Sequence, residues 1–147
     1  MGFVRIAVCC LLLAALFACS TDRRVENGHA RGLALEDLAG RTYYLISMNG
    51  KVFTGDNTPE LGFTWEGRVI GRACNRFNGA AKIINGTLTA EDMVSTRMAC
   101  FQPFLNEMEQ MLTDMLRHGA RMSLAGNRLT LAKDGRSLVY ELPLPRT

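Results

Sequence analysis

Two polar segments of the chain carry residue types that could recognise a charged partner. The first follows Cys74 and the second precedes Cys100. Two guanidinium groups held on a rigid corner would suit an anionic partner, because guanidinium forms paired hydrogen bonds with carboxylate or phosphate. A structural role is the alternative: the asparagines satisfy turn backbone, and the arginines stack on phenylalanine or pair with a carboxylate. The candidate binding corner comprises Asn75, Arg76, Phe77, Asn78 and Arg97.

The five cysteines divide into three near the N-terminus and two in the body of the chain. Cys9 and Cys10 fall in an apolar leader, and Cys19 stands at its end. The remaining pair, Cys74 and Cys100, is expected to form a disulfide in an oxidising compartment. Such a bridge would stabilise the fold by about 3 kcal/mol, because it restricts the unfolded chain. Two free buried thiols are the alternative.

An oxidising compartment is indicated by residues 1–18. Arg5 is their only charged residue, and the run from Ile6 to Ala18 is entirely apolar. This run is too short to span a bilayer, which takes about 20 residues, and it is typical of a secretory signal. A buried N-terminal helix is the alternative. We therefore expect residues 1–18 to be a signal peptide that is removed.

The end of the leader, Leu16-Phe17-Ala18-Cys19, resembles the lipobox of bacterial lipoproteins. In such signals the cysteine is acylated and becomes the new N-terminus, so Cys19 is the predicted lipidation site. More than one acyl chain gives a stable membrane anchor. Ser20, where an aspartate would retain the protein in the inner membrane, favours the outer membrane. We expect residues 19–32 to be a flexible tether, with the protein facing the periplasm from the outer membrane.

Residues 33–147 are expected to form one α+β domain. Alternating apolar and polar residues between turn signals predict about eight short antiparallel strands, in a strongly curved sheet or partial barrel. Glycine paired with asparagine or aspartate suits tight hairpin turns, because both residues tolerate positive φ. Such pairs are Asn49-Gly50, Asn78-Gly79, Asn85-Gly86, Gly126-Asn127 and Asp134-Gly135.

One segment has the helical period instead. Apolar residues recur along one face between Phe104 and Leu116, which predicts one main α-helix that starts near Pro103 and stops before Gly119. Glu109 is assigned to the opposite, polar side. Three methionines lie on the apolar face, and such a stripe is either ordinary core or an adaptable binding surface.

No local motif indicates catalysis, metal binding or nucleic-acid binding. Ser95 has no histidine nearby, and no glycine-rich phosphate loop is present. His29 lies in the expected tether and His118 at the expected end of the helix, so no four-ligand metal set is visible. The net charge of +3 is too small to indicate nucleic acid. We therefore expect no enzyme, no cofactor, no metal and no nucleic-acid partner.

Four short motifs of the chain occur in a characteristic order and spacing. They are Cys74-Asn75-Arg76-Phe77 with Gly79, Asn85-Gly86 with Leu88-Thr89-Ala90, Thr96-Arg97-Met98 with Cys100, and Asn127 with Leu129-Thr130-Leu131. In these motifs the chain resembles the META-domain family of bacterial lipoproteins, and the resemblance covers nearly its whole length. The resemblance implies a β-rich META fold with one helix and no established catalytic site. It also implies a heat-inducible envelope protein linked to tolerance of novobiocin.

Together these observations predict a monomeric, non-enzymatic lipoprotein that supports envelope integrity under heat or antibiotic stress. It would act by binding an envelope protein or an apolar ligand. The alternative is a pilotin-like or chaperone-like module, in which a hydrophobic slot between helix and sheet holds a protein segment or a lipid. A pocket with converging carboxylates of shifted pKa would instead indicate an enzyme.

Overall fold

The computed structural model describes residues 32–144. The predicted signal peptide, the predicted lipidation site Cys19 and residues 19–31 of the predicted tether lie outside this range. So do residues 145–147.

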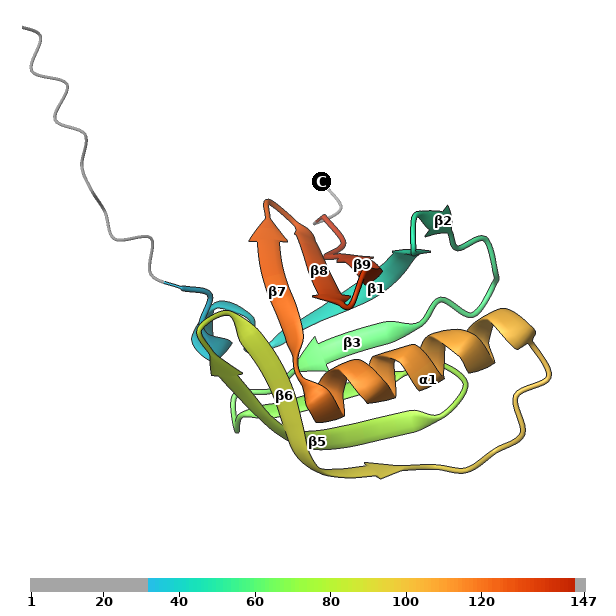
Figure 1. Cartoon of the computed structure of the whole chain (residues 1–147), viewed down its shortest axis with the longest axis horizontal. Coiled ribbons are helices and arrows are strands. Elements are labelled where there is room, and N and C mark those ends of the chain that lie inside the picture. The colour runs from blue at the N-terminus through green and yellow to red at the C-terminus, as the bar shows by residue number, and fades with distance from the viewer. Residues whose placement is uncertain (1–31, 145–147) are drawn as a thin grey trace, which may run out of the picture.

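Within residues 32–144, nine strands and one main helix follow a short 3-10 helix (Figure 1). The elements are η1 (Leu35–Asp37), β1 (Arg41–Met48), β2 (Lys51–Val52), β3 (Glu60–Phe63), β4 (Arg68–Arg72), β5 (Arg76–Ile84), β6 (Thr87–Ser95), α1 (Pro103–His118), β7 (Ala120–Ala125), β8 (Arg128–Lys133) and β9 (Arg136–Glu141).

The strands form an antiparallel barrel that is closed by β1. Strand β1 pairs with β3 through residues 41–44 and, on its other edge, with β9 through Tyr44 to Met48. The ring order is β1-β3-β4-β5-β6-β7-β8-β9, and β2 adds only a short pairing at the end of β1. For the described residues, the predicted α+β class, antiparallel strands and single main helix are confirmed, and the predicted partial barrel is a closed one.

Most of the predicted hairpin turns are present, because the residues chosen for positive φ adopt it. Asn49, Asn85 and Asp134 have φ values of 50°, 50° and 49°, and each is followed by a glycine with φ between 74° and 79°. These pairs connect β1 to β2, β5 to β6 and β8 to β9. Local sequence therefore fixes these connections.

The turn predicted at Asn78-Gly79 is wrong, because both residues lie inside β5. The pairing of β5 with β6 shifts between Asn78 and Ala80, which marks a β-bulge. A Cβ atom on Gly79 would lie 2.9 Å from the backbone oxygen of Glu91. Glycine is thus needed here for the close approach of two strands and not for a reversal of the chain.

Helix α1 covers the barrel where two neighbouring strands separate. Strands β6 and β7 share only the pairs Thr87–Arg121 and Leu88–Ala120, and α1 connects these strands in the chain. The helix packs against β6 and β8 and crosses in front of the barrel in Figure 1. Its buried residues are Leu105, Met108, Met111, Leu112, Met115 and Leu116. The methionine stripe is therefore part of the core.

An ion pair holds the C-terminal half of α1 to the β8–β9 hairpin. The guanidinium of Arg136 donates to Oδ2 of Asp114 at 2.7 Å. This hydrogen bond is the main reason why the pKa of Asp114 lies below its usual value. No helix within residues 32–144 has the length and the apolar character needed to cross a bilayer.

Two tyrosines in the barrel interior have hydroxyl groups without a hydrogen-bond partner. Tyr43 and Tyr140 are fully buried, and theirs are the buried side-chain polar atoms left unpaired among the described residues. Burial also raises the pKa of Tyr140. A buried hydroxyl without a partner costs about 1–3 kcal/mol of desolvation.

We predict that Tyr140→Phe leaves the free energy of unfolding unchanged or raises it by about 1 kcal/mol, because the lost hydroxyl makes no hydrogen bond. Tyr140→Ala should lower it by about 3–5 kcal/mol, because it opens a cavity in the core. Urea denaturation measures both values. A loss of more than about 1 kcal/mol in Tyr140→Phe would show that the hydroxyl has a stabilising partner.

Candidate functional site

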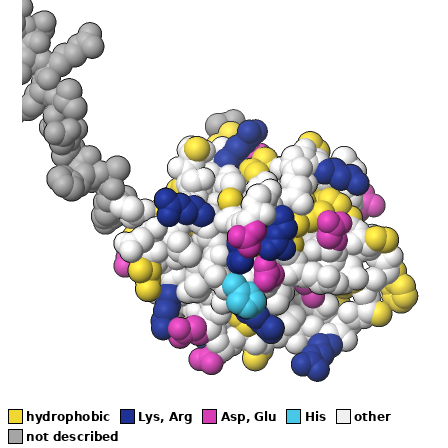
Figure 2. Space-filling model, viewed as in Figure 1, with side chains coloured by type: hydrophobic (Ala, Val, Ile, Leu, Met, Phe, Trp, Pro, Cys, Tyr) yellow, Lys and Arg dark blue, Asp and Glu magenta, His cyan; other side chains and the backbone are white. Residues whose placement is uncertain are grey.

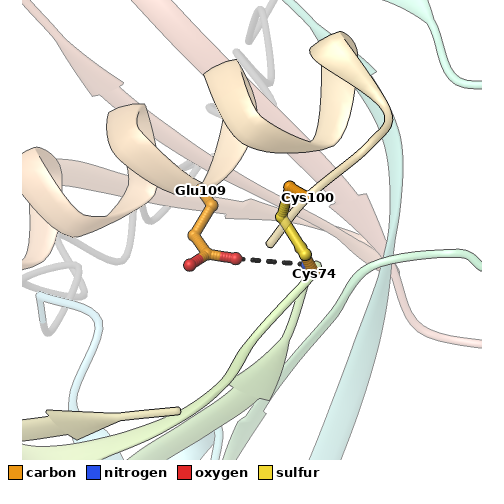
Figure 3. Close-up of side chains that lie close together, drawn as sticks. All are labelled: Cys74, Cys100 and Glu109. Carbon is orange, nitrogen blue, oxygen red and sulfur yellow. Dashed lines mark hydrogen bonds between the residues drawn. A yellow bond between two sulfur atoms is a disulfide. The ribbon is translucent and has the colours of Figure 1, made fainter. Parts of the chain in front are cut away.

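A disulfide between Cys74 and Cys100 joins two segments of the domain that are distant in sequence. Cys74 lies in the bend between β4 and β5, and Cys100 lies in the loop, residues 96–102, that leads into α1. The two Cα atoms are 5.8 Å apart and the residues are 26 positions apart in the chain (Figure 3). The bridge therefore fixes the loop before α1 to the β4–β5 corner.

Asn75 holds the same loop through its side-chain amide. Asn75 is a polar residue, yet it is buried, with 6% of its surface exposed. Its Oδ1 accepts hydrogen bonds from the hydroxyl of Thr96 at 2.9 Å and from the N–H of Met98 at 2.7 Å. Its Nδ2 donates to the carbonyl of Met98 at 3.4 Å. The side chain of Asn75 therefore hydrogen-bonds the backbone of the loop, as in the structural alternative of the sequence analysis.

The carboxylate of Glu109 connects α1 to the β4–β5 corner. Its Oε2 accepts hydrogen bonds from the N–H groups of Asn75 at 2.8 Å and Cys74 at 3.2 Å. Its Oε1 accepts one from Nδ2 of Asn75 at 2.9 Å. Figure 3 shows the side chain reaching from the helix to Cys74, beside the disulfide. One anion thus satisfies three donors of a segment that belongs to no strand.

The predicted place of Glu109 on the polar side of the helix, opposite the apolar face, is wrong. Glu109 is half-buried. It lies four residues after Leu105, three before Leu112 and seven before Leu116, which are all buried. A single acid within an apolar helical stripe is the signal that could have identified it.

The arginines at the corner differ in their partners. Arg72 pairs with Glu60 at 2.5 Å, and Arg68 donates to the side-chain oxygen of Asn78. Arg76 and Arg97 are exposed, and within residues 32–144 no carboxylate pairs with either of them.

The predicted binding corner is therefore only partly one site. Asn75 serves the network below the surface, and Phe77 is a core residue with 7% of its surface exposed. Asn78 lies in β5 as the partner of Arg68. Arg76 borders a hollow beside the disulfide, whereas Arg97 is not among the residues that line it.

The hollow beside the disulfide has a volume of about 650 Å³. Met98 and Phe101 border it with 63% and 93% of their surfaces exposed. Hydrophobic side chains gather at the edge of the face in Figure 2 where Figure 1 places the start of α1, while charged residues of both signs are interspersed elsewhere. We call this feature the disulfide hollow; its principal lining residues are Arg72, Cys74, Arg76, Met98, Phe101 and Leu105.

Three potential metal ligands meet at the same corner. The donor atoms of Cys74, Cys100 and Glu109 lie within 4.8 Å of one another. A cysteine binds metal as a thiolate, and here both sulfurs are joined in the disulfide. The carboxylate of Glu109 is in turn occupied by three N–H donors. We therefore assign this group to the scaffold of the hollow.

Comparisons with known proteins agree with this architecture. A family model described as META domain matches residues 36–142. The chain is 43% identical over 108 residues to heat shock protein HslJ of Escherichia coli (strain K12), which covers 73% of this chain and 77% of that protein. It is also similar to a protein solved by NMR, with a TM-score of 0.69, 41% identity, and coverage of 75% of this chain and 95% of that one. An NMR structure of a protein from Burkholderia xenovorans, with a TM-score of 0.58, 19% identity, and coverage of 76% and 87%, shares the fold.

We predict that Glu109→Gln lowers the free energy of unfolding by about 1.5–3 kcal/mol, because an amide NH₂ cannot accept the hydrogen bonds that one carboxylate oxygen accepts. Glu107→Gln is the matched control: Glu107 is exposed on the same helix, so its substitution should change stability by less than about 0.5 kcal/mol. Urea denaturation measures both. Equal losses of stability in the two variants would show that the hydrogen bonds accepted by Glu109 do not stabilise the fold.

We predict that the double variant Cys74→Ser, Cys100→Ser loses about 3 kcal/mol of stability, because the bridge no longer restricts the unfolded chain. Reductant should lower the urea midpoint of the natural protein and leave that of the double variant unchanged. A natural protein whose midpoint does not respond to reductant would contradict the stabilising role of the bridge.

Proposed function

Since the chain belongs to the META-domain family, we propose that it is a non-catalytic lipoprotein of the outer membrane that supports envelope integrity by binding. It faces the periplasm and acts under heat or antibiotic stress, including exposure to novobiocin. The name heat shock protein, which the relative HslJ carries, supports the heat-related part of this proposal.

The lipobox at Leu16-Phe17-Ala18-Cys19 supports the membrane anchor. The polar residues from Ser20 to Arg31 would extend to about 40 Å, which is enough to hold the domain clear of the lipid head groups. The predicted tether precedes η1 in the chain. An anchored domain that is free to move at this distance can meet a partner in the periplasm.

The observation that carries the binding proposal is the disulfide hollow. A phenylalanine with 93% of its surface exposed stands beside an apolar recess on a fixed corner. Exposed apolar groups beside a recess mark an interaction surface, because covering them with a partner removes apolar surface from water and is favourable.

The carboxylates near the hollow support a role other than catalysis. Glu60 is paired with Arg72, and Glu109 accepts three N–H donors. Each is thus committed to a contact within the protein and is not poised to transfer a proton. The methionines of α1 are buried in the core. The recess beside the helix start therefore supports the proposal better than a slot between helix and sheet.

We predict that a strain lacking the protein is more sensitive to heat and to novobiocin, and that the natural chain restores tolerance. Cys19→Ser should restore little, because the chain then has no acyl anchor. Phe101→Ser should also fail, because it removes the exposed apolar group of the hollow. Colony survival measures tolerance, and labelled palmitate incorporation with membrane fractionation measures anchoring.

Val52→Ser is the matched control for Phe101→Ser. Val52 is also apolar and exposed, but it lies in β2, and the hollow is lined by other residues. This variant should restore tolerance fully. Unchanged survival of the deletion strain under heat and novobiocin would contradict the proposed role, and absence of palmitate from the natural chain would contradict the anchor.

A further inference from the structure

The disulfide hollow combines an apolar wall with an unpaired cation. Met98, Phe101 and Leu105 supply the apolar wall. Arg76 borders the hollow from β5, and no carboxylate in the described part of the chain pairs with it. A recess of about 650 Å³ lies within the range of about 300–1,000 Å³ that is usual for small-molecule sites.

Arg76 borders three recesses. It borders the disulfide hollow, a second recess of about 350 Å³ that Phe77 also lines, and a third of about 330 Å³ beside Val94. Arg72 borders the first two as well, but its charge is balanced by Glu60 at 2.5 Å. Among the described residues that border these recesses, Arg76 is therefore the arginine without a carboxylate partner.

The start of α1 adds positive potential to the same end of the hollow. Gln102, the N-cap residue of the helix, and Leu105, in its first turn, line the hollow. Gln102 gives no side-chain cap, and the first turn carries no acidic residue, whereas Arg117 and His118 stand in the last turn. The uncompensated N-terminal end of a helix dipole favours an anion.

We propose that the disulfide hollow binds a single-chain amphiphile with one anionic head group. A carboxylate or phosphate head accepts paired hydrogen bonds from the guanidinium of Arg76. The apolar chain covers Phe101 and Met98, which are otherwise exposed to water. This inference rests on the proposed binding function and names the class of ligand.

Both walls of the hollow are held in place before any ligand arrives. The corner wall is fixed by Glu109, and the loop wall by Asn75 and by the disulfide. The ligand therefore does not have to order the loop, and this lowers the cost of binding.

The test is a titration of the chain from residue 19 to residue 147 carrying Cys19→Ser, so that neither an acyl chain nor the apolar leader competes for the hollow. The probes are dodecanoate, dodecyl phosphate and dodecyltrimethylammonium, each below its micelle concentration, with acetate and inorganic phosphate as chainless anions. NMR shifts at Arg76, Met98 and Phe101 locate binding, and calorimetry gives the affinity. Both anionic chains should bind at these residues, the cationic chain at least about tenfold more weakly, and the chainless anions not at all.

Arg76→Gln should weaken binding of the anionic chains by about tenfold or more and should not weaken binding of the cationic chain. Arg117→Gln is the matched control, because Arg117 is an exposed arginine at the other end of α1; this variant should bind like the parent chain. The two anionic head groups distinguish the possible sources of the ligand. Preference for dodecanoate indicates a free fatty acid, and preference for dodecyl phosphate indicates a lipid phosphate.

Equal affinity for anionic and cationic chains would overturn the inference, because the hollow would then recognise only apolar surface. Binding of a short acidic, leucine-containing peptide without binding of any amphiphile would overturn it too. If no amphiphile binds but Phe101→Ser still fails to restore tolerance, the result contradicts the proposed ligand class and supports the proposed function. If amphiphiles bind as expected but the deletion strain has full tolerance, the result contradicts the proposed function and supports the amphiphile site in the disulfide hollow.

Discussion

The hydrogen bonds that the carboxylate of Glu109 accepts are the interaction on which the β4–β5 corner depends. The carboxylate accepts three hydrogen bonds from Cys74 and Asn75, in a bend that belongs to no strand. A charged acceptor strengthens such bonds, and a half-buried site shields them from water. Because Asn75 also holds the backbone of Met98, one helix residue positions the bend directly and the loop before α1 indirectly.

The rest of the domain places Glu109 where this can happen. The barrel is closed by the β1–β9 pairing, so the β4–β5 bend has a fixed position relative to β6 and β8, on which α1 packs. Asp114 and Arg136 hold the C-terminal half of the helix, and Glu109 holds its N-terminal half. The disulfide then joins two segments that the hydrogen bonds already bring together.

Much of the fold could be predicted from the sequence because its signals are local. Asn49-Gly50, Asn85-Gly86 and Asp134-Gly135 fix their hairpins through φ alone, and the periodic apolar residues of α1 fix its buried face. The cysteine pair followed from counting, because the other three cysteines fall at or before residue 19. These features need no knowledge of the distant parts of the chain.

The site could be predicted only in part because its contacts are set by strand register. Arg72 lies beside Glu60 because β3 pairs with β4 in one register, and Arg68 reaches Asn78 because β4 pairs with β5. The same reason explains the error at Gly79, where glycine permits a close strand approach. Which arginine stays unpaired is therefore a property of the sheet, and the sequence alone does not reveal it.

Amide hydrogen exchange of the ligand-free protein tests the central claim most directly, namely that this network forms the hollow before anything binds. The N–H groups of Asn75 and Met98 are hydrogen-bonded although they lie outside helices and strands. The account predicts that both amides exchange as slowly as the hydrogen-bonded amides of the barrel strands, because they open only when the corner unfolds. Exchange as fast as that of the exposed Arg97 would contradict it.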